Sequence, residues 1–463
     1  MGKQERKEMI GNEGKVLLDM VRRLHRRGAV GHLTRLVSKT HPVDMVWVYR
    51  HLPDEEREAL FEIIVKVSSV GEFLSELDKS LVQELVERLS AEKMAEIISE
   101  MPSDDAVDLL EILPEDQAEQ ISHHLEKQDR EEMEELLQYD HESAGGIMSP
   151  DFMCLNEGCT IQEAITAIQK RSEEMEMVFY LYLTHGDGRL SGVVSLRELL
   201  MHPPEKALKE VMNPNVISVT TDTDQGDVAI VVSKYDFLAV PVVDSNYTLV
   251  GIVTVDDIID VIREEASEEF LQMAGVGKDR EILFKTANES AFIRAPWLFA
   301  SWVGGIMAMF IIGQFEDELA QMIALASFIP VVIGMGGNIA TQSSTIIVRG
   351  IATGRVNLAE AGKVIFKELR VGLILGLIYG LFLGLIAWLM FHGEGEPSLL
   401  GLVVGLSIFL CMIMSACIGA LIPMILKRFD VDAAIATGPF VTTSIDMLGV
   451  LLYFSMAKLF LNL

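Results

Sequence analysis

The residues best suited to chemistry lie in the apolar C-terminal part of the chain, where polar side chains are costly. The segment VVIGMGGNIATQSS, residues 331–344, sits inside an uncharged run, residues 319–348. On a helix, steps of four, three and four residues place four of its side chains on one face: Gly334, Asn338, Thr341 and Thr345. Such a face is typical either of helix packing by small residues or of a water-filled passage through the membrane.

One acid lies inside the last apolar segment, AAIATGPFVTTSIDMLGVLLYF. Asp446 is the one charged residue in the five apolar segments defined below, so none of them offers a base for a structural ion pair. A charged side chain at the bilayer centre costs at least about 2.5 kcal/mol unless water or a partner solvates it. Helical spacing places Gly438, Thr442 and Gly449 on the same face. We therefore expect Asp446 to line a cation pathway.

The ligand types favour a hard cation. A carboxylate with amide, hydroxyl and carbonyl oxygens suits Mg²⁺, Ca²⁺ or Mn²⁺, and a proton is also compatible. The four cysteines (Cys154, Cys159, Cys411 and Cys417) form no CxxC motif, and the apolar segments contain no His. Because no HExxH motif is present either, we expect no enzyme activity.

These residues require elements that cross a membrane. A spanning helix needs about 20 mostly apolar residues. Five segments meet that requirement: 296–314, 319–348, 371–391, 397–426 and 433–457. Pro330 is expected to kink the second of them.

The loops between these segments predict the orientation. The second and fourth loops hold all the loop bases: Arg349, Arg355, Lys363, Lys367, Arg370, Lys427 and Arg428. The loops around 316–318 and 392–398 contain no Lys or Arg. By the positive-inside rule the N-terminus is cytoplasmic and the C-terminus lies outside, in a multi-pass protein of a prokaryotic plasma (inner) membrane. The N-terminus, MGKQERKEMI, lacks the apolar core of a signal peptide.

The charge is concentrated before the membrane part. The chain carries −30, and residues 296–463 hold 10 acids against 8 bases, a net of −2, so residues 1–295 carry −28. An acidic surface of this size argues against nucleic acid as a partner and suits cations, although acidity also serves solubility.

Two kinds of internal repeat divide the acidic part. Residues 88–99, 100–111 and 112–123 align at a 12-residue period and predict a superhelical, α-helical N-domain over 15–140. Further on, MSPDFMCLNEGCTIQEA (148–164) aligns with MNPNVISVTTDTDQGDV (212–228). In the same way, GVVSLREL (192–199) aligns with GIVTVDDI (251–258), which predicts two α/β units over 141–263.

The second repeat resembles a tandem pair of CBS domains. Its shared features are a Met-x-Pro start, a strand ending in Pro-Val-Val-Asp, and a Gly-h-h-[ST]-x-x-[DE] motif, where h is an apolar residue. The resemblance implies a possible ATP site at Ser195, Glu198, Thr254 and Asp257, with Arg197 facing a phosphate. Many CBS pairs bind no nucleotide, so this function stays open.

An acidic segment, 264–295, connects this pair to the membrane part as a predicted plug-like helix. The acids of DDIIDVIREEASEEFLQMAG (256–275) recur at helical spacing. Like charges four residues apart destabilise a helix unless a cation bridges them. The segment is therefore either a solvated helix face or a cation sensor.

The order of these parts resembles the MgtE family of magnesium channels, and PVVIGMGGNIATQSSTIIVRGIATG (330–354) resembles its second-span motif. The fold class is then a multidomain membrane protein: a helical N-domain, an α/β CBS pair and an all-α membrane domain (296–463) of five helices. The resemblance implies a homodimeric Mg²⁺-selective channel for uptake, with a hydrated ion at Asp446. The other residues implied in the ion path are Gly337, Asn338, Thr341, Gly438 and Thr442.

The resemblance also implies that Mg²⁺ is a regulator as well as the substrate, because cytosolic Mg²⁺ closes members of the family. The acids implied in sensing are Asp104, Asp105, Asp108, Asp224, Asp236, Asp257, Asp260, Glu265, Glu268, Glu269 and Asp432. Two other functions remain open: an ion-coupled divalent cation carrier with Asp446 as its proton site, and a membrane-anchored CBS nucleotide sensor. Beyond a second copy and membrane lipid, we expect no nucleic acid and no obligate protein partner.

Overall fold

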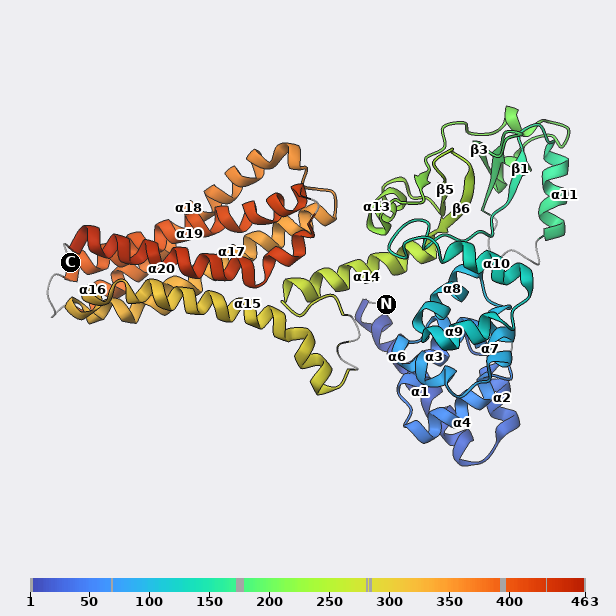
Figure 1. Ribbon diagram of the computed structural model, residues 1–463, viewed down its shortest axis with the longest axis horizontal. Helices are drawn as coiled ribbons and strands as arrows, with labels where there is room; N and C mark the ends of the chain where they lie inside the picture. The colour runs from blue at the N-terminus through green and yellow to red at the C-terminus, as the bar shows by residue number, and fades with distance from the viewer. Residues whose placement is uncertain are drawn as a thin grey trace. The chain divides into compact units, whose positions relative to one another are not determined.

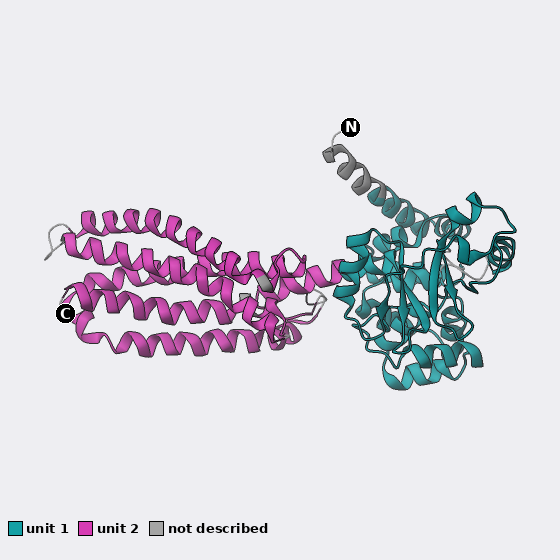
Figure 2. Ribbon diagram, turned by 90° about the horizontal axis from the view of Figure 1, so that it is seen from above, with its two compact units in different colours: residues 1–261 teal, residues 262–463 magenta. Residues whose placement is uncertain are grey.

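The protein is described by a computed structural model that covers residues 3–67, 70–171, 179–279, 282, 285–391, 397–429 and 431–461. Most of the predicted outer loop, 392–398, lies outside the described residues. The chain forms two compact units, residues 1–261 and 262–463 (Figure 2). Each unit is described separately below.

The first unit begins with short stacked helices. They are α1 (Lys3–Arg26), α2 (Val30–Val37), α3 (Pro42–Arg50), α4 (Asp54–Ile64), α5 (Val70–Ser75), α6 (Lys79–Val86), α7 (Ala91–Ile98), α8 (Ser103–Ile112), α9 (Glu115–Ser122) and α10 (Lys127–Leu136). From α6 to α10 the first residues are 79, 91, 103, 115 and 127, each 12 after the last. The predicted 12-residue repeat is confirmed and includes one further helix on each side.

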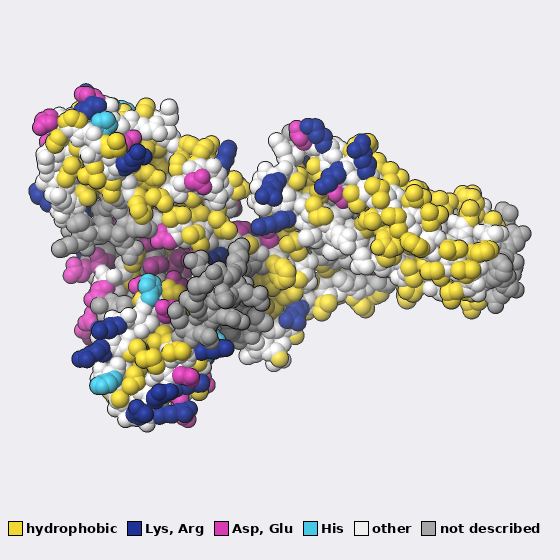
Figure 3. Space-filling model, turned by 180° about the vertical axis from the view of Figure 1, so that it is seen from behind, with side chains coloured by type: hydrophobic (Ala, Val, Ile, Leu, Met, Phe, Trp, Pro, Cys, Tyr) yellow, Lys and Arg dark blue, Asp and Glu magenta, His cyan; other side chains and the backbone are white. Residues whose placement is uncertain are grey.

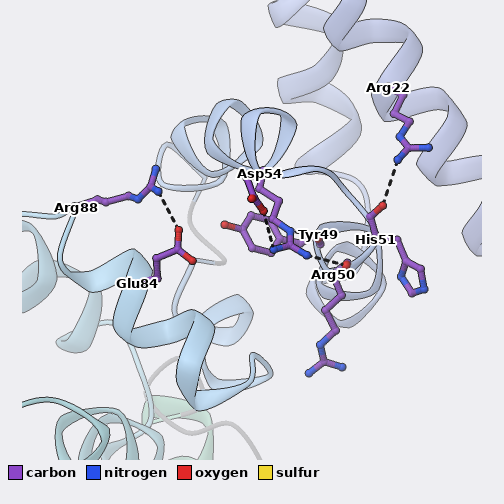
Figure 4. A network of polar contacts seen from close by, with 8 residues as sticks. Arg22, Tyr49, Arg50, His51, Asp54, Glu84 and Arg88 are labelled. Carbon is purple, nitrogen blue, oxygen red and sulfur yellow. Dashed lines mark hydrogen bonds and ion pairs between the residues drawn. The ribbon is translucent and has the colours of Figure 1, made fainter. Parts of the chain in front are cut away.

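Arginine side chains bind the exposed carbonyl groups at the end of α3 (Figure 4). Arg57 donates from Nε to the carbonyl of Tyr49 and from Nη2 to that of Arg50, each at 3.0 Å. Arg22 donates from Nη2 to the carbonyl of His51 at 3.3 Å. The last carbonyls of a helix lack intrahelical donors, and cations interact favourably with that end. These bonds therefore hold α1 and α4 against the end of α3.

The rest of the unit contains two three-stranded sheets of the same topology. They are formed by β1 (Cys154–Asn156), β2 (Tyr180–Thr184) and β3 (Leu190–Ser195), and by β4 (Val219–Thr220), β5 (Ala239–Val243) and β6 (Leu249–Thr254). In each sheet the first two strands are parallel and the last two antiparallel, with a register shift near the same end. The helices beside them are α11 (Ile161–Arg171), α12 (Leu196–Met201), η1 (Leu208–Glu210) and α13 (Gln225–Tyr235).

The start of each repeat packs against the sheet of the other repeat. Ser149 bridges to Ile252 on β6, and an ideal Cβ added to Gly251 would lie 2.6 Å from the sulfur of Met148. The same arrangement joins Asn213 to β3, with the sulfur of Met212 2.5 Å from such a Cβ on Gly192. Glycine is required at these two positions because any side chain would displace the methionine. The two repeats therefore form one body.

The second unit is helical. Its elements after α14 (Val255–Met273), which begins in the first unit, are α15 (Ala287–Gly313), α16 (Glu316–Gln321), η3 (Ile323–Phe328), α17 (Ile329–Ala352), η4 (Leu358–Glu360), α18 (Ala361–Met390), α19 (Pro397–Arg428), η5 (Ala433–Thr437) and α20 (Pro439–Leu461) (Figure 1). Among the described residues, five helices are long and apolar enough to cross a membrane. Figure 3 shows apolar side chains over most of this unit and Lys and Arg gathered at one end.

Three helix boundaries differ from the predictions. Pro330 lies in the first turn of α17, where its missing N–H is tolerated, so the predicted kink is wrong. The first spanning helix begins at Ala287, nine residues before the predicted 296, because Thr286 and Glu289 form a capping box there. The acidic helix α14 ends at Met273, so the segment 264–295 is not one helix.

Glycine sets the spacing of α18 and α19, which pack along each other. Ideal Cβ atoms added to Gly380 and Gly384 would lie 2.7 Å from the carbonyl oxygens of Gly405 and Gly401. This close approach is the small-residue packing expected between membrane helices. It occurs away from the polar segment of α17, which instead packs against α19 and α20.

Candidate ion pathway and cation-sensing surfaces

Asp446 on α20 faces α17 at Gly337. An ideal Cβ added to Gly337 would lie 4.0 Å from Oδ1 of Asp446, so the glycine leaves the carboxylate accessible. Asp446 is half-buried and forms no hydrogen bond or ion pair with any other described residue. Two residues predicted to line the ion path are therefore adjacent, and the acid is free to interact with a cation.

The polar face of α17 is left open in the single chain. Gly334 and Asn338 are exposed, Thr341 and Thr345 are half-buried, and a Cβ added to Gly334 would meet no described atom within 4 Å. Gly336, on the opposite face, would place such a Cβ 2.9 Å from the sulfur of Cys411. Helix packing within the chain thus uses Gly336, and the polar face is available to lipid, water or a second copy.

The predicted face of α20 is only partly correct. Gly438 precedes the helix, which starts at Pro439, and its carbonyl accepts a hydrogen bond from the Thr442 hydroxyl at 3.3 Å. Gly449 is buried and packs toward Cys411. Gly438 is therefore not on a helical face with Asp446, because the segment before Pro439 is the 3₁₀ turn η5. Thr442 remains beside Asp446, one turn away on α20.

A second buried acid, Glu368, was missed by the sequence analysis. Ser343 on α17 donates to Oε2 of Glu368 on α18 at 2.7 Å, and Glu368 is only 3% exposed. The predicted span began at residue 371, whereas α18 begins at Ala361 and so includes this acid. The available signal was the apolar environment on both sides of KELR, residues 367–370.

A third acid of the membrane unit, Glu318 on α16, is held at the opposite end. Its Oε1 lies 2.7 Å from Nζ of Lys458 near the end of α20, and the side chain of Glu318 is 5% exposed. The hydroxyl of Tyr453 also donates to the carbonyl of Leu325 at 2.9 Å. These bonds fasten the segment between α15 and α17 to the helix that carries Asp446.

In the first unit, Asp104 on α8 and Asp257 at the start of α14 are close enough to interact. Burial raises the pKa of Asp104 to about 7, with a further contribution from the charge of Asp105. Burial and the nearby charge of Asp104 raise the pKa of Asp257 to about 7, against the effect of its hydrogen bond from Thr254. Oδ1 of Asp104 is buried without a partner among the described residues. A cation would satisfy this oxygen and remove the repulsion between the two carboxylates.

The remaining predicted sensing acids of the first unit are more dispersed. Asp105 and Asp108 lie beside Asp104 on α8. Asp224 caps the start of α13 by accepting a hydrogen bond from the amide of Gly226 at 2.9 Å, and Asp236 follows the end of that helix. Eleven helical residues lie between these two acids and separate them by about 18 Å along the helix axis. They therefore cannot share one ion within a single chain, and Asp260 is exposed.

In the second unit, bases already neutralise two of the predicted sensing acids. Glu268 lies 3.7 Å from Lys278, and Glu269 lies 3.4 Å from Arg349 on α17. Burial raises the pKa of Glu269, and the positive charge of Arg349 lowers it. The negative charges of Glu265 and Asp432 also raise it. Asp432 accepts a hydrogen bond from the amide of Ala434 at 2.9 Å and so caps η5. The sequence analysis had not paired these acids with Lys278 and Arg349.

No three His, Cys, Asp or Glu side chains gather closely enough to hold a metal ion by themselves in the part of the chain that the structure describes. Any cation bound here must keep water ligands or draw ligands from a second copy. Mg²⁺ suits such a site because it gives up its water reluctantly.

Of the residues predicted to bind a nucleotide, Thr254 lines a small pocket between the two sheets. Ser195 and Glu198 form a capping box at the start of α12, and Thr254 donates to Asp257. The pocket is lined by Met153, Phe179, Tyr180, Tyr182, Leu238, Ala239, Ile252 and Thr254. The Tyr182 hydroxyl is buried without a hydrogen-bond partner among the described residues. Arg197 is exposed.

The five apolar helices among the described residues indicate a multi-pass membrane protein, and the family matches place it in the cation-transporter class. Residues 329–456 match the MgtE family of divalent cation transporters, 40–142 match the MgtE intracellular N domain, and 144–205 and 208–264 match the CBS domain. The magnesium transporter MgtE of Bacillus subtilis (strain 168) is 34% identical over 440 residues, which are 95% of this chain and 96% of that protein. The chain belongs to the MgtE family.

Other relatives agree with this assignment. The magnesium transporter MgtE of Thermus thermophilus is 37% identical over 341 residues, 73% of this chain and 74% of that protein. A crystal structure of the cytosolic domain of the Mg²⁺ channel MgtE in complex with ATP is 33% identical, with a TM-score of 0.50, and covers 53% of this chain and 99% of its own. The predicted family and fold class are confirmed.

Proposed function

We propose that the protein is a Mg²⁺-selective channel for magnesium uptake that holds a hydrated ion at Asp446. The observation that carries this proposal is the half-buried carboxylate beside Gly337, which forms no hydrogen bond or ion pair with any other described residue. An intramembrane acid without a structural partner marks an ion path by default. The names of the relatives, magnesium transporters at 34% and 37% identity, support Mg²⁺ as the substrate.

Two copies are proposed to form the passage. Gly334 and Asn338 on the polar face of α17 are exposed, and among the described residues a single copy offers too few acids to enclose a bare ion. A two-fold axis beside this face would bring Asp446, Asn338 and Thr341 of both copies around one hydrated ion. Gly438 and Thr442 lie toward its mouth in this proposal.

Flux measurements test the passage. Asp446→Ala protein reconstituted in liposomes is expected to lose Mg²⁺ flux by about 100-fold or more while remaining folded, because the ion loses its charged contact. Asp317→Ala removes an exposed acid from the same unit and serves as the matched control. Flux of the Asp446→Ala protein equal to that of the control would refute the ion-path assignment.

The same assay separates the channel from an ion-coupled carrier. A carrier that protonates Asp446 predicts Mg²⁺ flux that depends on a pH gradient or on a second ion. A channel predicts single-channel currents driven by the Mg²⁺ gradient and the voltage alone.

We propose that cytosolic Mg²⁺ closes the channel by binding the acidic surfaces of both units. Support comes from Asp104 and Asp257, two like charges in partial burial with one unsatisfied oxygen, and from the acids around Glu269. A divalent ion would favour the closed state by its greater affinity for the state in which these acids are close. The N-terminal unit is accordingly placed in the cytoplasm, as the basic loops indicate.

ATP binding at the CBS pair is a second proposal and rests on the pocket beside Thr254. The cavity there is only about 10 Å³ and Tyr182 is 2% exposed, so a nucleotide requires this pocket to open, after which the unpartnered Tyr182 hydroxyl offers a hydrogen bond. The solved relative with ATP supports this ligand. Titration calorimetry is expected to show ATP binding that Tyr182→Ala abolishes and Leu200→Ala, at an exposed side chain outside the pocket, does not. If titration of ATP into the unaltered protein gives no heat of binding, the CBS pair does not bind ATP and its function is structural.

A further inference from the structure

The first 41 residues have a charge opposite to that of the rest of the soluble part. They contain 10 Lys and Arg against 4 Asp and Glu, a net of +6. Residues 1–295 hold 30 bases and 58 acids, so residues 42–295 hold 20 bases and 54 acids, a net of −34. Such asymmetry within one chain indicates a nucleic-acid or membrane surface as the partner of the basic part. Residues 1–39 also precede the range that matches the MgtE N-domain, 40–142.

The structure places these bases on α1 and α2 and in the turn that follows each helix. Six of them are exposed: Lys15, Arg23, Arg26, Arg27, Arg35 and Lys39. Arg26 lies 3.8 Å from Glu56 but is 74% exposed, and the other five form no ion pair among the described residues. Figure 3 shows Lys and Arg gathered at the end of the N-domain that includes these helices. We call these six residues the basic surface.

Apolar side chains accompany the bases. Val16, Met20 and Val30 are 58%, 44% and 59% exposed. Val16, Met20 and Arg23 follow steps of four and three residues and so share one face of α1, and Arg27 directly follows the end of that helix. The opposite face, with Val21 at its centre, packs into the core of the N-domain. The exposed face therefore combines apolar and guanidinium groups rather than charge alone.

This combination distinguishes a lipid surface from other anionic partners. Valine and methionine can enter the boundary of the acyl chains while arginine binds headgroup phosphates. Clusters of about four to eight Lys and Arg are typical of binding to anionic lipid. Nucleic acid or an acidic protein would neutralise the charge but would leave these apolar side chains without an apolar environment.

We propose that the basic surface binds anionic phospholipid headgroups on the cytoplasmic face of the membrane that the second unit spans. The cytoplasmic location rests on the proposed function, since it follows from the proposed orientation. Binding would restrain the motion of the N-domain, which carries Asp104. The charge of the lipid headgroups would then influence the cation-sensing acids.

Hydrogen exchange of the full-length protein in nanodiscs tests this proposal. Amides of residues 15–40 are expected to exchange about tenfold more slowly in discs of phosphatidylcholine and phosphatidylglycerol than in phosphatidylcholine alone. The protection should disappear at about 0.5 M salt, which screens exposed charge. It should also disappear in R23Q/R27Q/R35Q protein and persist in K170Q/K209Q/K234Q, which removes three exposed bases elsewhere in the first unit.

Equal exchange in both kinds of disc would overturn the proposal. Protection by heparin in phosphatidylcholine discs, without protection by phosphatidylglycerol, would also overturn it and indicate a soluble polyanion as the partner. Both faces of a nanodisc are accessible, so the result does not depend on the orientation in the cell. Asp446→Ala protein should give the same protection, which separates this test from that of the channel.

Discussion

The soluble and membrane units treat their acids in opposite ways. Residues 1–295 carry −28, and Asp104 lies close enough to Asp257 for its charge to raise the pKa of Asp257. In the membrane unit each buried acid lies apart from the others: Glu368 accepts a hydrogen bond from Ser343, and Glu318 pairs with Lys458. Asp446 is the exception, since no described residue neutralises or hydrogen-bonds it.

Clustered acids and an isolated acid suit different functions. Acids held close together at a protein surface repel one another, and a bound divalent cation removes that repulsion. The equilibrium between conformations in which these acids are close or apart therefore depends on the cation concentration. An isolated carboxylate among neutral oxygens cannot trap a divalent ion strongly, and it therefore suits an ion that must leave again. Clustered acids favour sensing, and a single acid favours passage.

The strongest test of this contrast removes the charge of both clustered acids. Asp104→Asn/Asp257→Asn protein is expected to retain Mg²⁺ flux at millimolar internal Mg²⁺ at about ten times the unaltered level, because no repulsion remains for the ion to relieve. Flux into liposomes loaded with increasing Mg²⁺ measures this. Asp116→Asn/Glu119→Gln makes the same charge change on exposed α9 and should close normally. Normal closure of the first variant would show that these acids do not sense the ion.

The same acids predict a dependence of stability on pH. Their pKa is about 7 in the folded protein and about 4 when unfolded, so protonation favours the folded state. Without divalent cations, this contribution is complete below about pH 4 and is lost as the pH rises through 7. The melting temperature of the Asp104→Asn protein at pH 8 in EDTA should accordingly be about 5 °C higher than that of the unaltered protein. No increase would mean that Asp104 is not buried as a costly carboxylate in solution.

A smaller effect on Mg²⁺ flux is expected at Glu368, whose carboxylate already accepts a hydrogen bond within the membrane unit. Thr341 and Ser343 are two residues apart and so point about 200° from each other on α17, which places the bond to Glu368 behind the polar face. Ser343→Ala should reduce maximal Mg²⁺ flux about three- to twentyfold, since hydrogen bonds between membrane helices contribute about 0.6–1.7 kcal/mol.

Ser407→Ala is the matched control, because this buried hydroxyl has no partner among the described residues. Glu368→Gln keeps an oxygen that can accept the bond and should restore most of the flux that Glu368→Ala loses. Equal effects of Ser343→Ala and Ser407→Ala would show that the bond does not position α17.

The smallest effect is expected at Glu269, because the guanidinium of Arg349 already pairs with the carboxylate that a metal cation would bind. Arg349→Gln frees this carboxylate, so Mg²⁺ should close the channel at about two- to fivefold lower concentration, as expected for an exposed ion pair. Lys427→Gln removes an exposed base from the other basic loop and should leave the half-inhibitory concentration unchanged. A shift to higher concentration would show that Arg349 assists closure instead.

Much of the architecture was predictable because it depends on local patterns. Apolar length identified the five spanning helices, and the 12-residue repeat predicted the spacing of α7, α8 and α9, which each begin three residues after the first residue of a predicted repeat unit. The CBS motifs and the second-span motif identified the family. The position of Gly438 was wrong because a Pro at the next position begins α20, and the preceding turn is 3₁₀ rather than α.

The sequence by itself therefore determined the order of the parts, the spans and the lone acid of the apolar segments. Only the tertiary structure decided which side chains meet: Asp446 with Gly337, Asp104 with Asp257, Ser343 with Glu368, and Glu269 with Arg349. The reason is physical. Hydropathy and helical period act along the chain, whereas the charge and hydrogen-bond partners of a buried group come from elements distant in sequence, and only packing brings them within range.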